Sequence, residues 1–162
     1  MTPVILLNCL ESFVKEKTSG IKLQVRVTNS TQEDKTREAL VYKMGLPGKD
    51  EKIQRIPYIL MQVISGKDDI QGQGMKQSIC QIRMVVAVYA ENDSQGGYDV
   101  LNVLLRIRSE LEKTGVIGGY FALQDPLEYI VYPDNTAPYY FGEMMTNWSM
   151  PVIVREVQKT WQ

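Results

Sequence analysis

The sequence contains no histidine, and this absence excludes several classes of enzyme at once. Without an imidazole there is no Ser-His-Asp or Cys-His nucleophile system, no HExxH zinc site and no histidine proton shuttle. Cysteine is scarce as well: Cys9 and Cys80 are far apart, lie in apolar surroundings and form no CxxC motif. We therefore expect two core thiols in a reducing cytoplasm, with neither a disulfide framework nor a zinc site.

A long apolar run and a strong charge of either sign are also missing. The apolar stretch at residues 3–10 is too short to span a membrane, and no basic segment precedes it as in a signal peptide. The formal net charge is −1 and the basic residues are scattered, which does not favour a nucleic-acid-binding surface. A chain of 162 residues with 44% apolar residues predicts one globular domain, residues 1–162.

Two segments have the apolar spacing of amphipathic helices. The first is predicted from Pro3 to about Thr18, with Thr2 as its N-cap. The second is predicted over residues 97–113, opened by Asp93-Ser94 and ended by Gly115 in a left-handed conformation. Alternating or continuous apolar residues predict strands at residues 21–28, 58–65, 79–90, 120–123, 127–132 and 139–150.

The segments between these elements are less regular. Residues 29–55 are the least decided part: their first portion fits either a short capped helix or an extended segment. A turn is predicted at residues 45–48 and a solvated charge cluster at residues 49–52. Residues 66–76 contain several glycines and are predicted to be a long connector. Pro151 is expected to close the last strand, with Val152–Val154 extending the edge of the sheet. The order of elements predicts an α+β fold, a mostly antiparallel sheet with two main helices packed on one face.

Candidate chemical sites are weak. The Gly-Gln-Gly in residues 66–74 lacks the Lys-Ser/Thr ending of a phosphate-binding loop. Asp68 and Asp69 are adjacent, so in a strand they would point apart, and a solvated acidic loop is favoured over a metal site. Glu128 and Glu143 lie on strands that could be neighbours, which keeps a carboxylate-based enzyme as a minority hypothesis. Aromatic residues between 129 and 148 lack interleaved basic residues, which favours core packing or a protein contact over base stacking.

Three segments together resemble the tail terminator, or tail completion, proteins of bacteriophages and prophages. They are Arg55–Leu60 with Ser65–Asp69, then Gly96–Asn102, and finally Pro126–Tyr129 through Pro138–Gly142 to Trp148–Pro151. The resemblance covers residues 44–156 and rests on the order and texture of the segments. It implies a structural protein of the virion tail that assembles in the host cytoplasm, without catalysis, cofactor, metal or membrane. Another neck or minor tail protein is the alternative within this class.

The family resemblance also implies partners. Such proteins form a ring of identical subunits, usually six, that docks on the finished tail tube and stops its growth. The ring then presents a surface to the head-closure or connector protein, and DNA only passes through its channel. A heterologous interface of this kind must rotate and close, because otherwise the subunits would form an open helical array.

Two groups of residues are candidate contact sites under this hypothesis. Tyr139, Phe141 and Met145 lie on one face of the last strand and fit either a contact with a subunit or tube, or burial inside one subunit. The predicted loop at residues 66–76 is expected either to become ordered against a partner or to place acidic groups in the channel, where they would repel DNA phosphates. The loop candidates are Lys67, Asp68, Asp69, Gln71 and Gln73.

Overall fold

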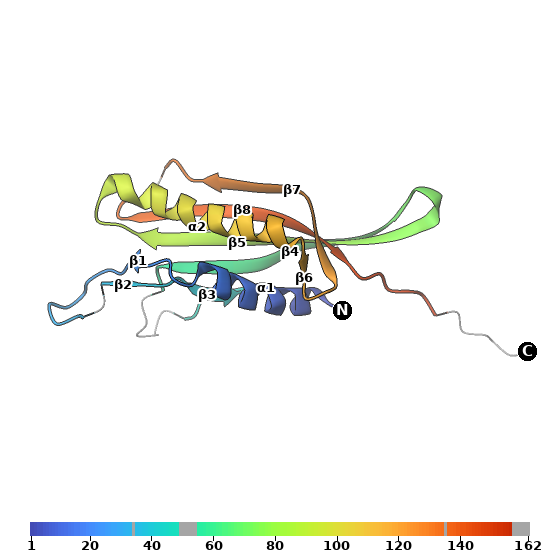
Figure 1. The fold of residues 1–162 in the computed structure, drawn as a ribbon, viewed down its shortest axis with the longest axis horizontal. Helices are drawn as coiled ribbons and strands as arrows, with labels where there is room; N and C mark the ends of the chain where they lie inside the picture. Colours follow the sequence, from blue (N-terminus) through green and yellow to red (C-terminus); the bar gives the residue numbers. More distant parts are fainter. Residues whose placement is uncertain (34, 49–54, 135, 157–162) are drawn as a thin grey trace, which may run out of the picture.

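The computed structural model of the protein describes residues 1–33, 35–48, 55–134 and 136–156 (Figure 1). It contains two helices, a six-stranded sheet and a small two-stranded sheet, which confirms the predicted α+β class. The elements are α1 (Pro3–Thr18), β1 (Leu23–Gln24), β2 (Thr36–Arg37), β3 (Leu40–Lys43), β4 (Tyr58–Gln71), the single 3-10 turn η1 (Gly72–Gly74), β5 (Met75–Tyr89), α2 (Asp93–Thr114), β6 (Val116–Ile117), β7 (Phe121–Val131) and β8 (Tyr139–Met150).

The large sheet has the strand order β3-β4-β5-β8-β7-β6. Its pairs are antiparallel except for β3 with β4, so the predicted mostly antiparallel sheet is confirmed. Both helices contribute to one core with the same side of this sheet, as predicted (Figure 1). We call this side the helix face and the opposite side, which carries Arg83, Phe141, Glu143 and Met145, the outer face.

Helix α1 begins where its sequence predicts. The Thr2 side chain accepts a hydrogen bond from the Ile5 amide, and Pro3 occupies the first helical position, where no amide is needed. On the exposed side, Glu11 joins the helix to β3 through an ion pair with Lys43, 2.6 Å between Oε2 and Nζ. Lys43, followed by Lys15, lowers the pKa of the Glu11 carboxyl.

Helix α2 lies close to β8 because two glycines leave room for larger neighbours. Gly96 faces the Tyr140 ring, which would collide with any side chain at that position, and the Tyr140 hydroxyl donates to the Asp93 carbonyl over 3.2 Å. Further along, a Cβ at Gly142 would lie 2.6 Å from Cγ1 of Val100. The helix begins earlier than predicted, at Asp93, because Asn92 caps it by accepting from the Ser94 amide. It ends at Gly115 with a φ of 70°, as predicted.

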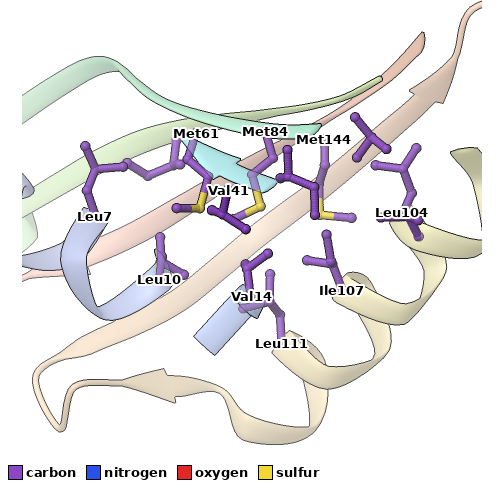
Figure 2. Packing of buried hydrophobic residues seen from close by; sticks show 14 of the residues in the cluster. Leu7, Leu10, Val14, Val41, Met61, Met84, Leu104, Ile107, Leu111 and Met144 are labelled. Atoms are coloured by element: carbon purple, nitrogen blue, oxygen red, sulfur yellow. The ribbon is translucent and has the colours of Figure 1, made fainter. Parts of the chain in front are cut away.

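The core contains a row of methionines across three neighbouring strands. Met61, Met84 and Met144 are paired in register and buried against the helices (Figure 2). Unbranched thioether side chains fill irregular space between a sheet and two helices. The helix side of this core is made of Leu6, Leu7, Leu10 and Val14 from α1, and Val100, Val103, Leu104, Ile107 and Leu111 from α2.

Two predicted elements in the first half of the chain differ from the structure. The strand predicted at residues 21–28 is only Leu23–Gln24, because its partner β2 is equally short and Val27 is exposed. Of the two alternatives for residues 29–55, the extended one holds where the structure describes them, as β2 and β3. The charge cluster predicted at residues 49–52 lies outside the described ranges.

Three predictions in the second half also need correction. Residues 66–76 are not a long connector, because β4 and β5 continue through them and leave only the turn Gly72–Gly74. The strands predicted at 120–123 and 127–132 are one strand, β7, with an irregularity between Gln124 and Glu128. Residues 152–154 do not extend the sheet, since β8 ends at Met150 and no strand follows up to residue 156.

The expectations for cysteine are met in part. Cys80 is buried, and burial raises the pKa of its thiol. Cys9 is partly exposed and packs against the core from α1. No helix within the described ranges is long and apolar enough to cross a membrane.

The packing of Gly96 gives a prediction for stability. Gly96→Ala should lower the free energy of unfolding by about 1–3 kcal/mol, because the new methyl group displaces the Tyr140 ring. Gly97→Ala is the matched control: nothing lies within contact distance there, and removing glycine from a helix should stabilise the protein by about 0.5–1 kcal/mol. Urea unfolding followed by circular dichroism measures both. Equal effects at the two positions would contradict the packing of Tyr140 on Gly96.

The Glu11–Lys43 ion pair gives a prediction for pH dependence. The pKa of the Glu11 carboxyl is lowered from its ordinary value of 4.5. The ion pair therefore stabilises the fold fully when the pH is above 4.5, and this stabilisation is lost as the pH falls through the lowered pKa. Glu11→Gln should therefore cost about 0.2–1 kcal/mol at pH 7 and almost nothing at pH 2. Urea unfolding at both pH values tests this, with Glu16→Gln on the same helix as control. A cost that is the same at both pH values would contradict the ion pair.

Candidate functional site: a projecting hairpin arm and the outer face of the sheet

The β4–β5 hairpin extends well beyond the rest of the domain (Figure 1). Strand β3 pairs with β4 only as far as Met61, and β8 pairs with β5 only from Ser78 onward. We call residues 65–79 the arm. Near its tip, Ile70 and Met75 are 65% and 69% exposed. A two-stranded ribbon has little stability of its own in water, so exposed apolar side chains on it indicate a contact surface.

The arm contains all five residues that were predicted to lie in a loop. Lys67, Asp68, Asp69 and Gln71 are in β4, and Gln73 is in the turn with a φ of 66°. Asp68 lies opposite Ser78 and Asp69 opposite Gln77, so their side chains are on different faces of the ribbon. The pairing therefore does not place the two carboxylates on one face of the ribbon.

Lys67 and Asp69 lie on the same face of the arm, where they form an ion pair. Their Nζ and Oδ2 atoms are 2.7 Å apart. This contact lowers the pKa of Asp69 and raises the pKa of Lys67. Asp68, in contrast, has no ion pair with any residue that the structure describes.

A groove of about 500 Å³ separates the arm from the 151–156 segment that follows β8. Its walls are Asp68, Asp69, Ile70, Lys76 and Gln77 from the arm, and Val152, Ile153 and Arg155 from the segment. The side-chain oxygen of Gln77 is buried and accepts no hydrogen bond from the described residues. The groove combines apolar walls with charged and amide side chains.

The outer face carries the other predicted contact residues. Tyr139, Phe141 and Met145 alternate with the buried Tyr140 and Met144 along β8, as expected for a strand. Phe141 packs against a small second cluster formed by Tyr58, Leu60 and Ala87. All three predicted residues are half-buried within one chain, which leaves both sequence alternatives open: a contact with a second molecule, and burial within one subunit.

An ion pair occupies the centre of the outer face. Arg83 Nε lies 2.7 Å from Glu143 Oε2 and joins β5 to β8. The Tyr132 hydroxyl is hydrogen-bonded to this pair. The pKa of Tyr132 is raised, first by burial and then by the neighbouring Glu143 carboxylate. Glu143 also raises the pKa of Arg83. This carboxylate is therefore held in a structural interaction.

The carboxylate pair considered in the sequence is brought to one face. Glu128 on β7 lies opposite Met145 on β8. Glu143 is two residues from Met145 along β8, so its side chain is on the same face. Since Glu143 is bound to Arg83, the two acids do not form a free pair of the kind that glycosidases use. The described part of the chain contains no group of three or more acidic or cysteine residues arranged to hold a metal ion.

Comparison of the sequence with models of protein families gave no match, and a search of curated proteins gave no match either.

The two alternatives for the outer face make different predictions. Phe141→Ala should lower the free energy of unfolding by about 1–3 kcal/mol, because Phe141 packs against Tyr58 and Leu60. Met145→Ala should cost less than about 1 kcal/mol in folding, because Met145 belongs to neither buried cluster. If the face is a contact with a second copy, this variant should also weaken self-association. Urea unfolding and sedimentation velocity measure the two effects. A Met145→Ala variant as unstable as Phe141→Ala, with unchanged association, would assign this face to the interior of one subunit.

Proposed function

We propose that this protein is a structural component of a phage tail, a terminator that forms a closed ring on the end of the tail tube. The observation that carries the proposal is the arm, a ribbon that extends beyond the domain and exposes Ile70 and Met75. Soluble proteins seldom leave apolar side chains on a projecting ribbon without a partner. The proposal assigns no catalytic role to any residue.

The segments that carry the family resemblance support this proposal by their arrangement. The first contributes the start of β4 and part of the arm, the second the beginning of α2, and the third β7 and β8. The second and third segments meet where Gly96 packs on Tyr140. The resemblance thus falls on elements that build one sheet, one helix and the arm.

The shape of the domain also suits a ring. A ring that stops tube growth needs one surface that matches the tube end and another that rejects further tube subunits. The arm projects from one end of the domain, while the short strands β1 and β2 lie at the other end (Figure 1). The two ends of a ring built from side-by-side copies would therefore differ, one toward the tube and one toward the head-closure protein.

The edges of the sheet favour a closed assembly over unlimited growth. On the β7 edge, Asp125 and Pro126 interrupt the regular pairing with β8, and a proline at an edge discourages strand addition because it lacks an amide N–H. The β4 edge has no such proline beyond Met61. Contacts are thereby directed to the arm and the outer face.

The assembly state tests the proposed function. Native mass spectrometry of the purified protein over a range of concentrations should show one discrete closed oligomer, with six copies expected, and negative-stain electron microscopy should show rings with a channel. A species that stops at two copies, or a series that grows without limit, would contradict the proposal.

A further inference from the structure

We propose that the 151–156 segment of one copy adds as a strand to the free edge of β4 in the next copy. The inference rests on the proposed ring and specifies how neighbouring copies are joined. It makes the arm and the segment two halves of one intersubunit contact.

The donor is an extended apolar segment without a partner in its own chain. Ile153 and Val154 are 80% and 81% exposed. Val-Ile-Val is a run of β-branched residues, which favour the extended conformation of a strand. The segment follows β8 directly but leaves the sheet at Pro151, beyond which no strand pairing is present up to residue 156.

The acceptor is the outer edge of β4. Beyond Met61, this edge has no neighbouring strand within the part of the chain that the structure describes. An unpaired strand edge presents a row of amide and carbonyl groups, which an extended peptide can bind through main-chain hydrogen bonds. A third strand would also stabilise the arm, because a two-stranded ribbon alone is only marginally stable.

The positions of donor and acceptor identify the occupant as a second copy of this chain. The segment follows Met150, which pairs with Ser78 on the β5 side of the arm, whereas the free edge is that of β4 on the other side of the ribbon. Both also project from the same end of the domain (Figure 1). Copies placed side by side around an axis would bring each donor to the acceptor of the next, a heterologous contact that can close.

Charge complementarity agrees with this contact. Asp68 of the acceptor strand and Arg155 of the donor segment form no ion pair with each other or with another described residue. The donor therefore brings a free cation, and the acceptor a free anion. An ion pair between copies would set the direction of association as well as add to its affinity.

Substitutions in the donor test the contact without disturbing the monomer fold. Ile153→Asp and Val154→Asp should each raise the dissociation constant of the oligomer about tenfold or more, because burial of one aliphatic side chain corresponds to at least that factor. Val27→Asp is the control, since Val27 is an exposed aliphatic residue after β1, outside the proposed contact. Native mass spectrometry measures the populations, and circular dichroism verifies that each variant folds.

Crosslinking between two different chains locates the contact. A chain with Ile153→Cys is mixed with an isotope-labelled chain carrying Lys67→Cys, Asp68→Cys or Asp69→Cys in turn, and peptide mass spectrometry identifies the disulfides after mild oxidation. Neighbouring strands bring paired residues within disulfide reach. A disulfide between residue 153 of one chain and residue 67, 68 or 69 of the other is expected, and the corresponding mixture with Val27→Cys should give none.

The outcomes separate the contact from the proposed function. A ring that is weakened by the donor substitutions and crosslinked at these positions supports both. A ring that forms unchanged in Ile153→Asp and Val154→Asp, with no such crosslink, overturns the strand addition and leaves the terminator function standing. A protein that remains monomeric at all concentrations, with no crosslink between chains, overturns the strand addition and removes the support for the ring.

Discussion

The antiparallel pairing of β4 with β5 determines how the rest of the molecule is organised. The ladder runs from Tyr58 opposite Ala87 to Gln71 opposite Met75, with one irregularity between Val63 and Ser65. Its inner half is covered by both helices and flanked by β3 and β8, which explains why Ile59, Met61 and Met84 are buried. Its outer half has no such cover. One continuous pair of strands therefore serves as the centre of the core and as an exposed arm.

This division assigns different roles to the parts of the chain. Helix α2 packs closely on the sheet at Gly96 and Gly142 and over the methionine row. The part of the domain outside the arm is therefore densely packed and rigid. The ion pair of Arg83 with Glu143 joins β5 to β8 on the outer face, behind the methionine row. A rigid body gives the arm a defined direction, which the proposed ring would need because each copy must reach the next at the same angle.

The elements with a buried face could be predicted from the sequence, and those without one could not. The limits of α1 and β8 follow from apolar spacing that the core enforces, and alternation placed Tyr139, Phe141 and Met145 on one face. The arm was not predicted because its strands bury neither face, so their sequences show no alternation of apolar and polar residues. Gly66 and Gly72 also suggested turns. The Gly72-Gln73-Gly74 turn between two strands of similar length was the available signal. Contacts such as Arg83 with Glu143 join residues 60 positions apart and depend on register.

Hydrogen exchange of the arm tests most directly whether a neighbouring copy completes it. Amide exchange in residues 65–71 and 151–156 is measured by mass spectrometry below and above the concentration at which the protein assembles. If a neighbouring copy supplies the missing strand, these amides should exchange at least about tenfold more slowly in the assembled protein. The amides of the methionine row in the core should be equally protected in both states. Equal exchange of the arm in the two states would contradict the proposed contact between copies.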